Sequence, residues 1–149
     1  MYRYKQLSPI DVADLKDLLR VFGEAFNDPG TYLDHVPRDE YLKSLLEQDH
    51  FIALAAFDGQ SVVGGLTAYV LEKFEQERKE IYIYDLAVID RYRRQGIATA
   101  LISLLGSIGK KIGAYVIFVQ ADKIDTPAIK LYESLGKPED VYNFDIDVT

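Results

Sequence analysis

The stretch "YDLAVIDRYRRQGIATALISLLGSIGKKIG", residues 84–113, decides the fold of this chain. It begins with apolar and β-branched residues that are typical of a strand. It then passes through a cluster of arginines to Gly96 and continues, without a break, in an apolar pattern of helical spacing. We therefore expect a strand, a short loop and a long helix that ends at Gly113.

A strand, a loop and a helix joined by a glycine are typical of an anion-binding site. The first backbone N–H groups of a helix have no acceptor within the helix, and the helix dipole favours negative charge there. Gly96 has no Cβ, so a ligand can approach the backbone closely. The dinucleotide fingerprint G-x-G-x-x-G is absent, and "GSIGKK" at residues 106–111 lacks the spacing and the Ser or Thr of a Walker loop. The segment predicts a phosphate site of another kind.

The remaining segments predict a mixed α/β domain that occupies residues 1–149 in one piece, with a central sheet and helices on both faces. The strand–helix–strand unit in the middle should be a parallel, right-handed crossover. A turn-rich break is expected at 27–37 and a charged connection at 72–80. Helices are expected at 8–26, 38–48, 94–113 and 126–136, and strands at 2–8, 50–57, 61–71, 81–89, 114–121 and 141–148.

Composition limits the function. The formal charge of −7 argues against broad nucleic-acid binding and suits a cationic small molecule, although mildly acidic proteins are also common for reasons of solubility. No apolar run is long enough to span a membrane, and the first residues lack the core of a signal peptide. The chain has no cysteine and two isolated histidines, so we expect no metal site and a cytoplasmic location.

Two motifs resemble those of the Gcn5-related N-acetyltransferase (GNAT) superfamily. Residues 93–98, "RRQGIA", match its pyrophosphate motif (Gln/Arg)-x-x-Gly-x-(Gly/Ala). "DTPAIKLYESLG" at 125–136 is similar to its later motif Asn-x-x-Ala-x-x-x-Tyr-x-x-x-Gly, with Asp125 in place of asparagine. Over nearly the whole chain, segments such as "TYLDHVPRDEYLKSLL", "FIALAAFDG" and "NFDID" resemble the type I aminoglycoside 3-N-acetyltransferases.

The resemblance implies a GNAT fold and direct transfer of acetyl from acetyl-coenzyme A, through a tetrahedral intermediate, to the 3-amino group of an aminoglycoside. It further implies a homodimeric antibiotic-resistance enzyme. Two alternatives stay open: a GNAT enzyme that acetylates another polyamine or a protein amine, and a binding module that holds coenzyme A without catalysis.

The resemblance also assigns residues to the cofactor. The backbone amides from Arg94 to Thr99 would bind the diphosphate with help from the Arg93 and Arg94 side chains, and the strand edge at 86–88 would pair with the pantetheine arm. The implied cofactor-binding set is Leu86, Ala87, Val88, Arg93, Arg94, Gln95, Gly96, Ile97, Ala98, Thr99, Ala128 and Tyr132.

Three residues are candidates for proton transfer. Asp85 is out of place in the apolar strand "IYIYDLAV", because burial of an unpaired charge is costly, so it is either a base or a structurally paired carboxylate. Regular alternation places it on the face of Ile81 and Ile83 unless a bulge intervenes. Glu80 is the second candidate base. As the candidate acid, Tyr132 matches the family tyrosine that lies near the cofactor sulfur, where its phenol could donate to a developing thiolate, although it is also a good helix-packing residue.

Acidic residues near the carboxyl ends of the strands are candidates for binding a cationic acceptor. Each one alone is typical of a solvated surface charge, and only together do they suggest a polycation pocket. The candidates are Asp122, Asp125, Asp145 and Asp147.

Overall fold

A five-stranded mixed sheet forms the centre of the computed structural model, which describes residues 1–149. The strands follow one another in the order β1-β2-β3-β4-β5, and the first four are antiparallel. β4 and β5 are parallel, as expected for the central crossover. The bounds are β1 Arg3–Gln6, β2 Phe51–Asp58, β3 Ser61–Lys73, β4 Arg78–Val88 and β5 Ala114–Val119.

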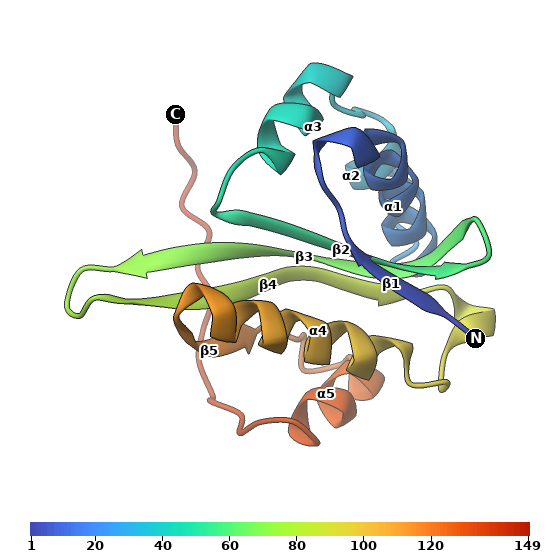
Figure 1. The fold of residues 1–149 in the computed structure, drawn as a ribbon. Coiled ribbons are helices and arrows are strands. Elements are labelled where there is room, and N and C mark those ends of the chain that lie inside the picture. Colours follow the sequence, from blue (N-terminus) through green and yellow to red (C-terminus); the bar gives the residue numbers. More distant parts are fainter.

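Helices cover both faces of the sheet, and this arrangement confirms the predicted fold class. α1, α2 and α3 lie on one face, whereas α4 and α5 lie on the other (Figure 1). Short 3-10 turns precede α1 at Pro9–Asp11 and α4 at Asp90–Tyr92. The helix bounds are α1 Val12–Ala25, α2 Pro29–Leu33, α3 Asp39–Leu46, α4 Ile97–Ile112 and α5 Thr126–Glu133.

The hydrophobic core forms two layers because β2 is covered on both faces. Its residues alternate between them: Ala53 and Ala55 pack with α1 and α3, and Ile52 and Leu54 pack with α4. Every residue from Phe51 to Phe57 is buried, which explains the near-continuous apolar run in the sequence.

α4 places the loop before it at the end of β4. Ile97, Leu101 and Leu105 recur every four residues and are buried against the sheet. The helix ends at Gly113, whose φ of 86° lies in the left-handed region and whose N–H bonds to the carbonyl of Gly109. The packed face of α4 therefore fixes the position of its first turn relative to the sheet.

Two local expectations need refinement. The charged segment 72–80 is mostly strand, because β3 continues to Lys73 and β4 begins at Arg78. The break at 27–37 contains the short helix α2, and the Asp28 side chain caps it by accepting a hydrogen bond from the N–H of Thr31.

The strand predicted at 141–148 is wrong for the single chain. No helix or strand follows α5, and every residue from 137 to 149 is exposed. The physical reason is that a strand needs a neighbour for its backbone groups, and no strand of this chain lies alongside the segment.

No helix in the structure combines the length and the apolar character that crossing a bilayer requires.

We predict that Gly65→Ala destabilises the fold. A Cβ at Gly65 would lie 2.5 Å from Leu18 Cδ1 and 2.5 Å from the Leu54 carbonyl oxygen, which is backbone and cannot turn away. The expected loss is about 1–3 kcal/mol, measured by urea unfolding. Gly106→Ala is the matched control, since nothing lies within 4 Å of its Cβ and alanine favours the helix. Equal stability of the two variants would contradict this prediction.

Candidate active site

A bulge in β4 decides where Asp85 points. Thr67 of β3 pairs with Asp85 and Ala68 pairs with Ile83, so Tyr84 is an extra residue between them. Ile81 and Ile83 pack on the α4 side of the sheet, whereas Asp85 contacts α2 on the opposite side. The expectation from regular alternation, that Asp85 shares a face with Ile81 and Ile83, is therefore wrong.

Two hydroxyl groups hold the Asp85 carboxylate. The hydroxyl of Tyr32 donates to Oδ1 at 2.7 Å, and that of Thr67 donates to Oδ2 at 3.2 Å. Burial, followed by the Asp85 carboxylate, raises the pKa of Tyr32 far above its usual range, so this phenol remains a donor. The carboxylate is thus oriented, with no basic side chain bonded to it.

Three tyrosine rings of β3 and β4 form an edge-to-face row beside this carboxylate. The rings of Tyr69 and Tyr84 meet edge to face at 6.0 Å between centroids, and those of Tyr82 and Tyr84 at 5.6 Å. Burial is the first cause of the raised pKa of Tyr69, and the charge of Asp85 is the second. Aromatic faces beside a carboxylate suit a cationic ligand.

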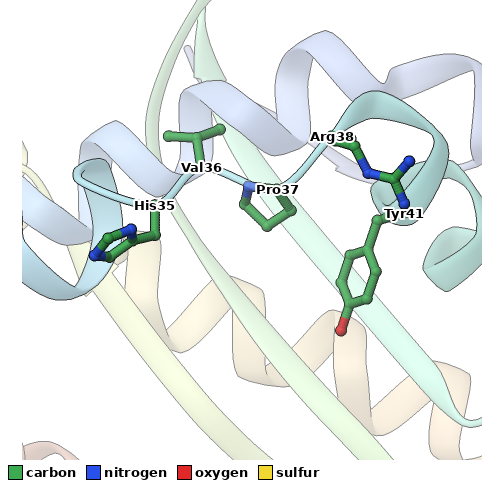
Figure 2. A pocket seen from close by; sticks show the side chains of 5 residues that line it. All are labelled: His35, Val36, Pro37, Arg38 and Tyr41. Atoms are coloured by element: carbon green, nitrogen blue, oxygen red, sulfur yellow. The ribbon is translucent and has the colours of Figure 1, made fainter.

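An open surface hollow of about 380 Å³ lies on the same side of the sheet as α2 and α3. It lies between α2 and α3, where His35 and Tyr41 point toward the sheet (Figure 2). Its lining residues are His35, Val36, Pro37, Arg38 and Tyr41.

β4 has an open edge beyond the bulge. Its pairing with β5 ends at Ile83 and Val119, so the residues from Asp85 to Val88 pair only with β3, and the bulged Tyr84 pairs with neither strand. The free side of this segment, which includes Leu86, Ala87 and Val88, offers unpaired backbone groups to an extended ligand.

The loop between β4 and α4 presents a set of free N–H groups. None of the backbone N–H groups of residues 94–99 has a backbone acceptor, and no side chain caps the helix. Arg94 and Gly96 have φ values of 62° and 82°, so the chain turns here in the left-handed region. Nothing lies within 4 Å of a Cβ built on Gly96. Six donors facing open space fit a diphosphate.

The side chains of Arg93 and Gln95 in this loop are bonded within the chain, whereas that of Arg94 is not. Arg93 donates from Nε to the carbonyl of Val88 at 3.0 Å and pairs with Asp90 at 2.8 Å, so it braces the loop against the end of β4. Gln95 accepts a hydrogen bond from the hydroxyl of Tyr2. Arg94 is exposed and has no hydrogen bond or ion pair, which leaves its charge free for a ligand.

α5 carries Tyr132, the candidate acid, on the α4 side of the sheet (Figure 1). Burial, followed by the charge of Asp125, raises the pKa of Tyr132 to about 12. The phenol therefore keeps its proton at neutral pH and is able to give it to a stronger base. Because Asp85 faces α2, the two candidates lie on opposite faces of the sheet.

Glu80 lies at the other end of β4, about 16 Å from Asp85 at ~3.3 Å per strand residue. It accepts a hydrogen bond from Tyr115 at 2.7 Å and pairs with Lys73 at 3.1 Å. These two contacts, in that order, lower its pKa. A paired carboxylate of low pKa is a weak base, so the structure favours Asp85 of the two candidates.

The four candidate acceptor-binding aspartates do not form one cluster. Asp122 is exposed in the loop after β5, and Asp125 caps α5 by accepting a hydrogen bond from the N–H of Ala128 at 3.2 Å. Asp145 and Asp147 lie in the exposed C-terminal segment, which ends level with α3, on the side of the sheet away from α5 (Figure 1). No group of three or more His, Cys, Asp or Glu residues is arranged to hold a metal ion.

Sequence reasoning missed the residues around Asp85. Tyr32 and Thr67 hold the carboxylate from positions 53 and 18 residues away. The tyrosines of "IYIYD" and "TYLD" are evident in the sequence, but the alternation of residues along a strand does not predict that they lie near Asp85.

The family model described as "Acetyltransferase (GNAT) family" matches residues 14–137. The crystal structure of an aminoglycoside acetyltransferase from an uncultured soil metagenomic sample is 57% identical, with a TM-score of 0.98 over 100% of this chain and 99% of that chain. Another aminoglycoside acetyltransferase from an uncultured soil metagenomic sample, in complex with sisomicin, is 33% identical, with a TM-score of 0.92 over 99% of this chain and 97% of that chain.

Among curated relatives, the catalytic subunit of the N-terminal acetyltransferase B complex of Arabidopsis thaliana is 32% identical over 99 residues. The match covers 64% of this chain and 55% of that protein. The chain thus spans about half the length of the first curated relatives that it matches.

We predict that Gly96→Ala weakens binding of coenzyme A roughly tenfold or more, about 1.4 kcal/mol, because the new methyl group enters the space that the free N–H groups face. Isothermal titration calorimetry with coenzyme A measures this effect. Gly113→Ala is the control, since Gly113 has a similar φ at the other end of α4 and the same strain of about 1–2 kcal/mol. If both variants bind equally well, the ligand does not use this loop.

Proposed function

Because this chain belongs to the acetyltransferase (GNAT) family, we propose that it transfers the acetyl group of acetyl-coenzyme A to the 3-amino group of an aminoglycoside antibiotic. The observation that carries the proposal is the set of six free N–H groups at residues 94–99, beside the open edge of β4. The likeness to aminoglycoside acetyltransferases over the whole chain supports the acceptor class. In this proposal the protein is a cytoplasmic resistance enzyme.

The backbone between β4 and α4 binds the co-substrate in this proposal. The N–H groups of residues 94–99 and the side chain of Arg94 hold the diphosphate, while Arg93 keeps the loop in place. The free edge at residues 86–88 pairs with the pantetheine arm and offers a backbone N–H to the oxyanion. Acetyl-coenzyme A supplies the activated thioester when bound.

Asp85 acts on the acceptor amine in this proposal, and Tyr132 acts on the departing thiolate. Asp85 takes a proton from the acceptor ammonium, directly or through a water molecule, so that the amine becomes a nucleophile. Tyr32 and Thr67 keep the carboxylate turned toward the acceptor face. As the carbon–sulfur bond breaks, the hydroxyl of Tyr132 donates a hydrogen bond to the developing thiolate, and its raised pKa keeps the phenol protonated in this role.

The acceptor binds among aromatic and acidic groups in this proposal. The tyrosines beside Asp85 and the surface hollow lined by Tyr41 accommodate a sugar with ammonium groups. Asp122 and Asp125 supply further negative charge from the loop after β5. The choice of the 3-amino group rests on the resemblance to the type I 3-N-acetyltransferases.

A second candidate acceptor is the amino terminus of a protein. The likeness to the N-terminal acetyltransferase of Arabidopsis thaliana favours it. A panel of acceptors separates the two, because an aminoglycoside enzyme should discriminate strongly against peptides.

We predict thiol release from acetyl-coenzyme A with gentamicin-type and fortimicin-type acceptors and little with amino-terminal peptides or simple polyamines. Release is followed with a thiol reagent, and mass spectrometry with NMR locates the acetyl group on the product. Turnover with peptides alone would favour the second acceptor, and tight binding of coenzyme A without any turnover would indicate a binding module.

We predict that Tyr132→Phe and Asp85→Asn each lower kcat by roughly 100-fold or more, with little change in the affinity for coenzyme A. Steady-state kinetics and calorimetry on the same preparations provide the two readouts. Glu80→Gln is the matched control, since Glu80 lies on the same strand away from the open edge. A Glu80→Gln defect as large as that of Asp85→Asn would contradict the assignment of the base.

We predict that Asp125→Asn raises KM for the aminoglycoside, more at low salt than at high salt, because screening weakens an exposed charge. Asparagine caps helices about as well as aspartate, so the variant removes the charge but keeps α5. An unchanged KM at low salt would place Asp125 outside the acceptor pocket and leave it with capping alone.

A further inference from the structure

The loop between β4 and α4 crosses the end of the sheet and bonds to the strands that it passes. The N–H of Ile89 donates to the carbonyl of Val63 in β3 at 2.9 Å. The hydroxyl of Tyr92 donates to Oδ2 of Asp58, the last residue of β2, at 2.7 Å. Through Tyr92 the loop is therefore attached to a strand that does not pair with β4.

Tyr2, which directly precedes β1, extends this series to the edge of the sheet. Its hydroxyl donates to Oε1 of Gln95, and its ring meets that of Tyr92 edge to face, with 5.9 Å between the centroids. The N-terminus accordingly lies beside the loop that leads into α4 (Figure 1). Residues 89, 92 and 95 thus bond in turn to β3, to β2 and to the residue before β1.

The backbone of the loop does not fix its own conformation. Arg94 has a φ of 62°, which a residue with a side chain rarely adopts. The N–H groups of residues 94–99 have no backbone acceptor, so no backbone hydrogen bond of their own holds them in one direction. An unfavourable backbone conformation persists only where the surrounding structure imposes it. The contacts of Tyr92 and Tyr2 supply this restraint together with those of Arg93.

Tyr92 is held at its ring and bonded at its hydroxyl. The ring packs against both layers of the core. The hydrogen bond to the Asp58 carboxylate, followed by burial, raises the pKa of Tyr92, so the phenol remains a donor at neutral pH. The side chain is thus a fixed link between the loop and the end of β2.

We propose that Tyr92, Asp58 and Tyr2 are positioning residues for the co-substrate. They act through the loop, because they hold the N–H groups of residues 94–99 in the arrangement that binds the diphosphate of coenzyme A. This inference rests on the proposed function, in which the loop binds that diphosphate.

The restraint affects binding and leaves the chemical step alone. It comes from the side of β1 and β2, whereas Asp85 lies on β4 and Tyr132 on α5. Loss of the restraint lowers the fraction of molecules whose loop is competent to bind, and the apparent affinity falls by that fraction. Transfer within the filled complex should proceed at the natural rate.

The charge of Asp58 allows a test in which two explanations predict opposite signs. The diphosphate is an anion, so removal of a nearby carboxylate should by itself strengthen binding. Removal of the acceptor of Tyr92 should weaken binding if Asp58 positions the loop. Asp58→Ala removes both the charge and the acceptor, whereas Asp58→Asn removes the charge and keeps an oxygen that accepts a hydrogen bond.

Isothermal titration calorimetry with coenzyme A measures these effects. Tyr92→Phe, Asp58→Ala and Tyr2→Phe should each raise Kd roughly 3- to 10-fold, as expected for the loss of one hydrogen bond. Asp58→Asn should bind at least as tightly as the natural chain. Tyr115→Phe is the matched control with unchanged Kd, since its hydroxyl also donates to a carboxylate at 2.7 Å but at the opposite end of β4. An Asp58→Ala variant that binds coenzyme A as tightly as the natural chain, or more tightly, would overturn the proposal.

A double variant and steady-state kinetics distinguish positioning from a general loosening of the fold. Tyr92→Phe combined with Asp58→Ala should bind about as weakly as either single variant, because all three lack the same bond. With acetyl-coenzyme A, the single variants should raise KM and leave kcat unchanged. Additive losses in the double variant, or a lower kcat at unchanged KM, would refute positioning.

The calorimetric test needs no acceptor, so its outcome is separable from that of the proposed reaction. If the natural chain binds coenzyme A but releases no thiol with aminoglycosides, the proposed acceptor is wrong and the positioning role stands. If the natural chain and the variants bind coenzyme A equally well, the positioning role alone is wrong.

Discussion

The backbone N–H groups at the start of α4 have no hydrogen-bond acceptor within the chain. The other parts of the candidate active site lie around this turn. Asp28 and Asp125 cap α2 and α5 with their side chains, whereas the N–H groups of residues 94–99 have neither a side-chain nor a backbone acceptor. The surrounding contacts fix the position of these N–H groups. Ile97 and Leu101 pack α4 on the sheet, and the side chain of Arg93 donates a hydrogen bond to the carbonyl of Val88. The donors therefore exist before a ligand arrives, which reduces the entropy lost on binding.

The sheet has an uneven edge next to this turn, because β4 extends further than β5. β5 stops at Val119 while β4 continues for five residues beyond its last pair with β5. The same uneven end exposes the edge at residues 86–88 and gives access to the carboxylate of Asp85 from one face and to the side of α5 from the other. In the proposed reaction, the co-substrate, Asp85 and Tyr132 approach this end of the sheet from different layers.

The sequence predicted those parts of the fold that depend on local pattern. The strand, the loop and the helix around Gly96 follow from periodicity and one glycine, and the hairpin of β2 and β3 follows from two apolar runs around "DGQ". The bulge at Tyr84 was not predictable, because it depends on which residues of β3 lie opposite. The same holds for Tyr32, whose bond to Asp85 joins segments far apart in sequence. Residues 141–148 alternate between apolar and polar side chains as a strand does, but they form no strand because no neighbouring strand of this chain pairs with them.

The bulge in β4 has a consequence for side-chain density. In a regular strand, residues on one face are about 6.6 Å apart along the chain, since every second residue turns away. Here the consecutive residues Tyr84 and Asp85 lie on the same face, with Cα atoms ~3.8 Å apart. The phenol ring of Tyr84 and the carboxylate of Asp85 therefore lie side by side, where a regular strand would place only one side chain on this face. In the proposed reaction, an ammonium group of the acceptor contacts both side chains, because one irregular residue places two functional groups where a regular strand places one.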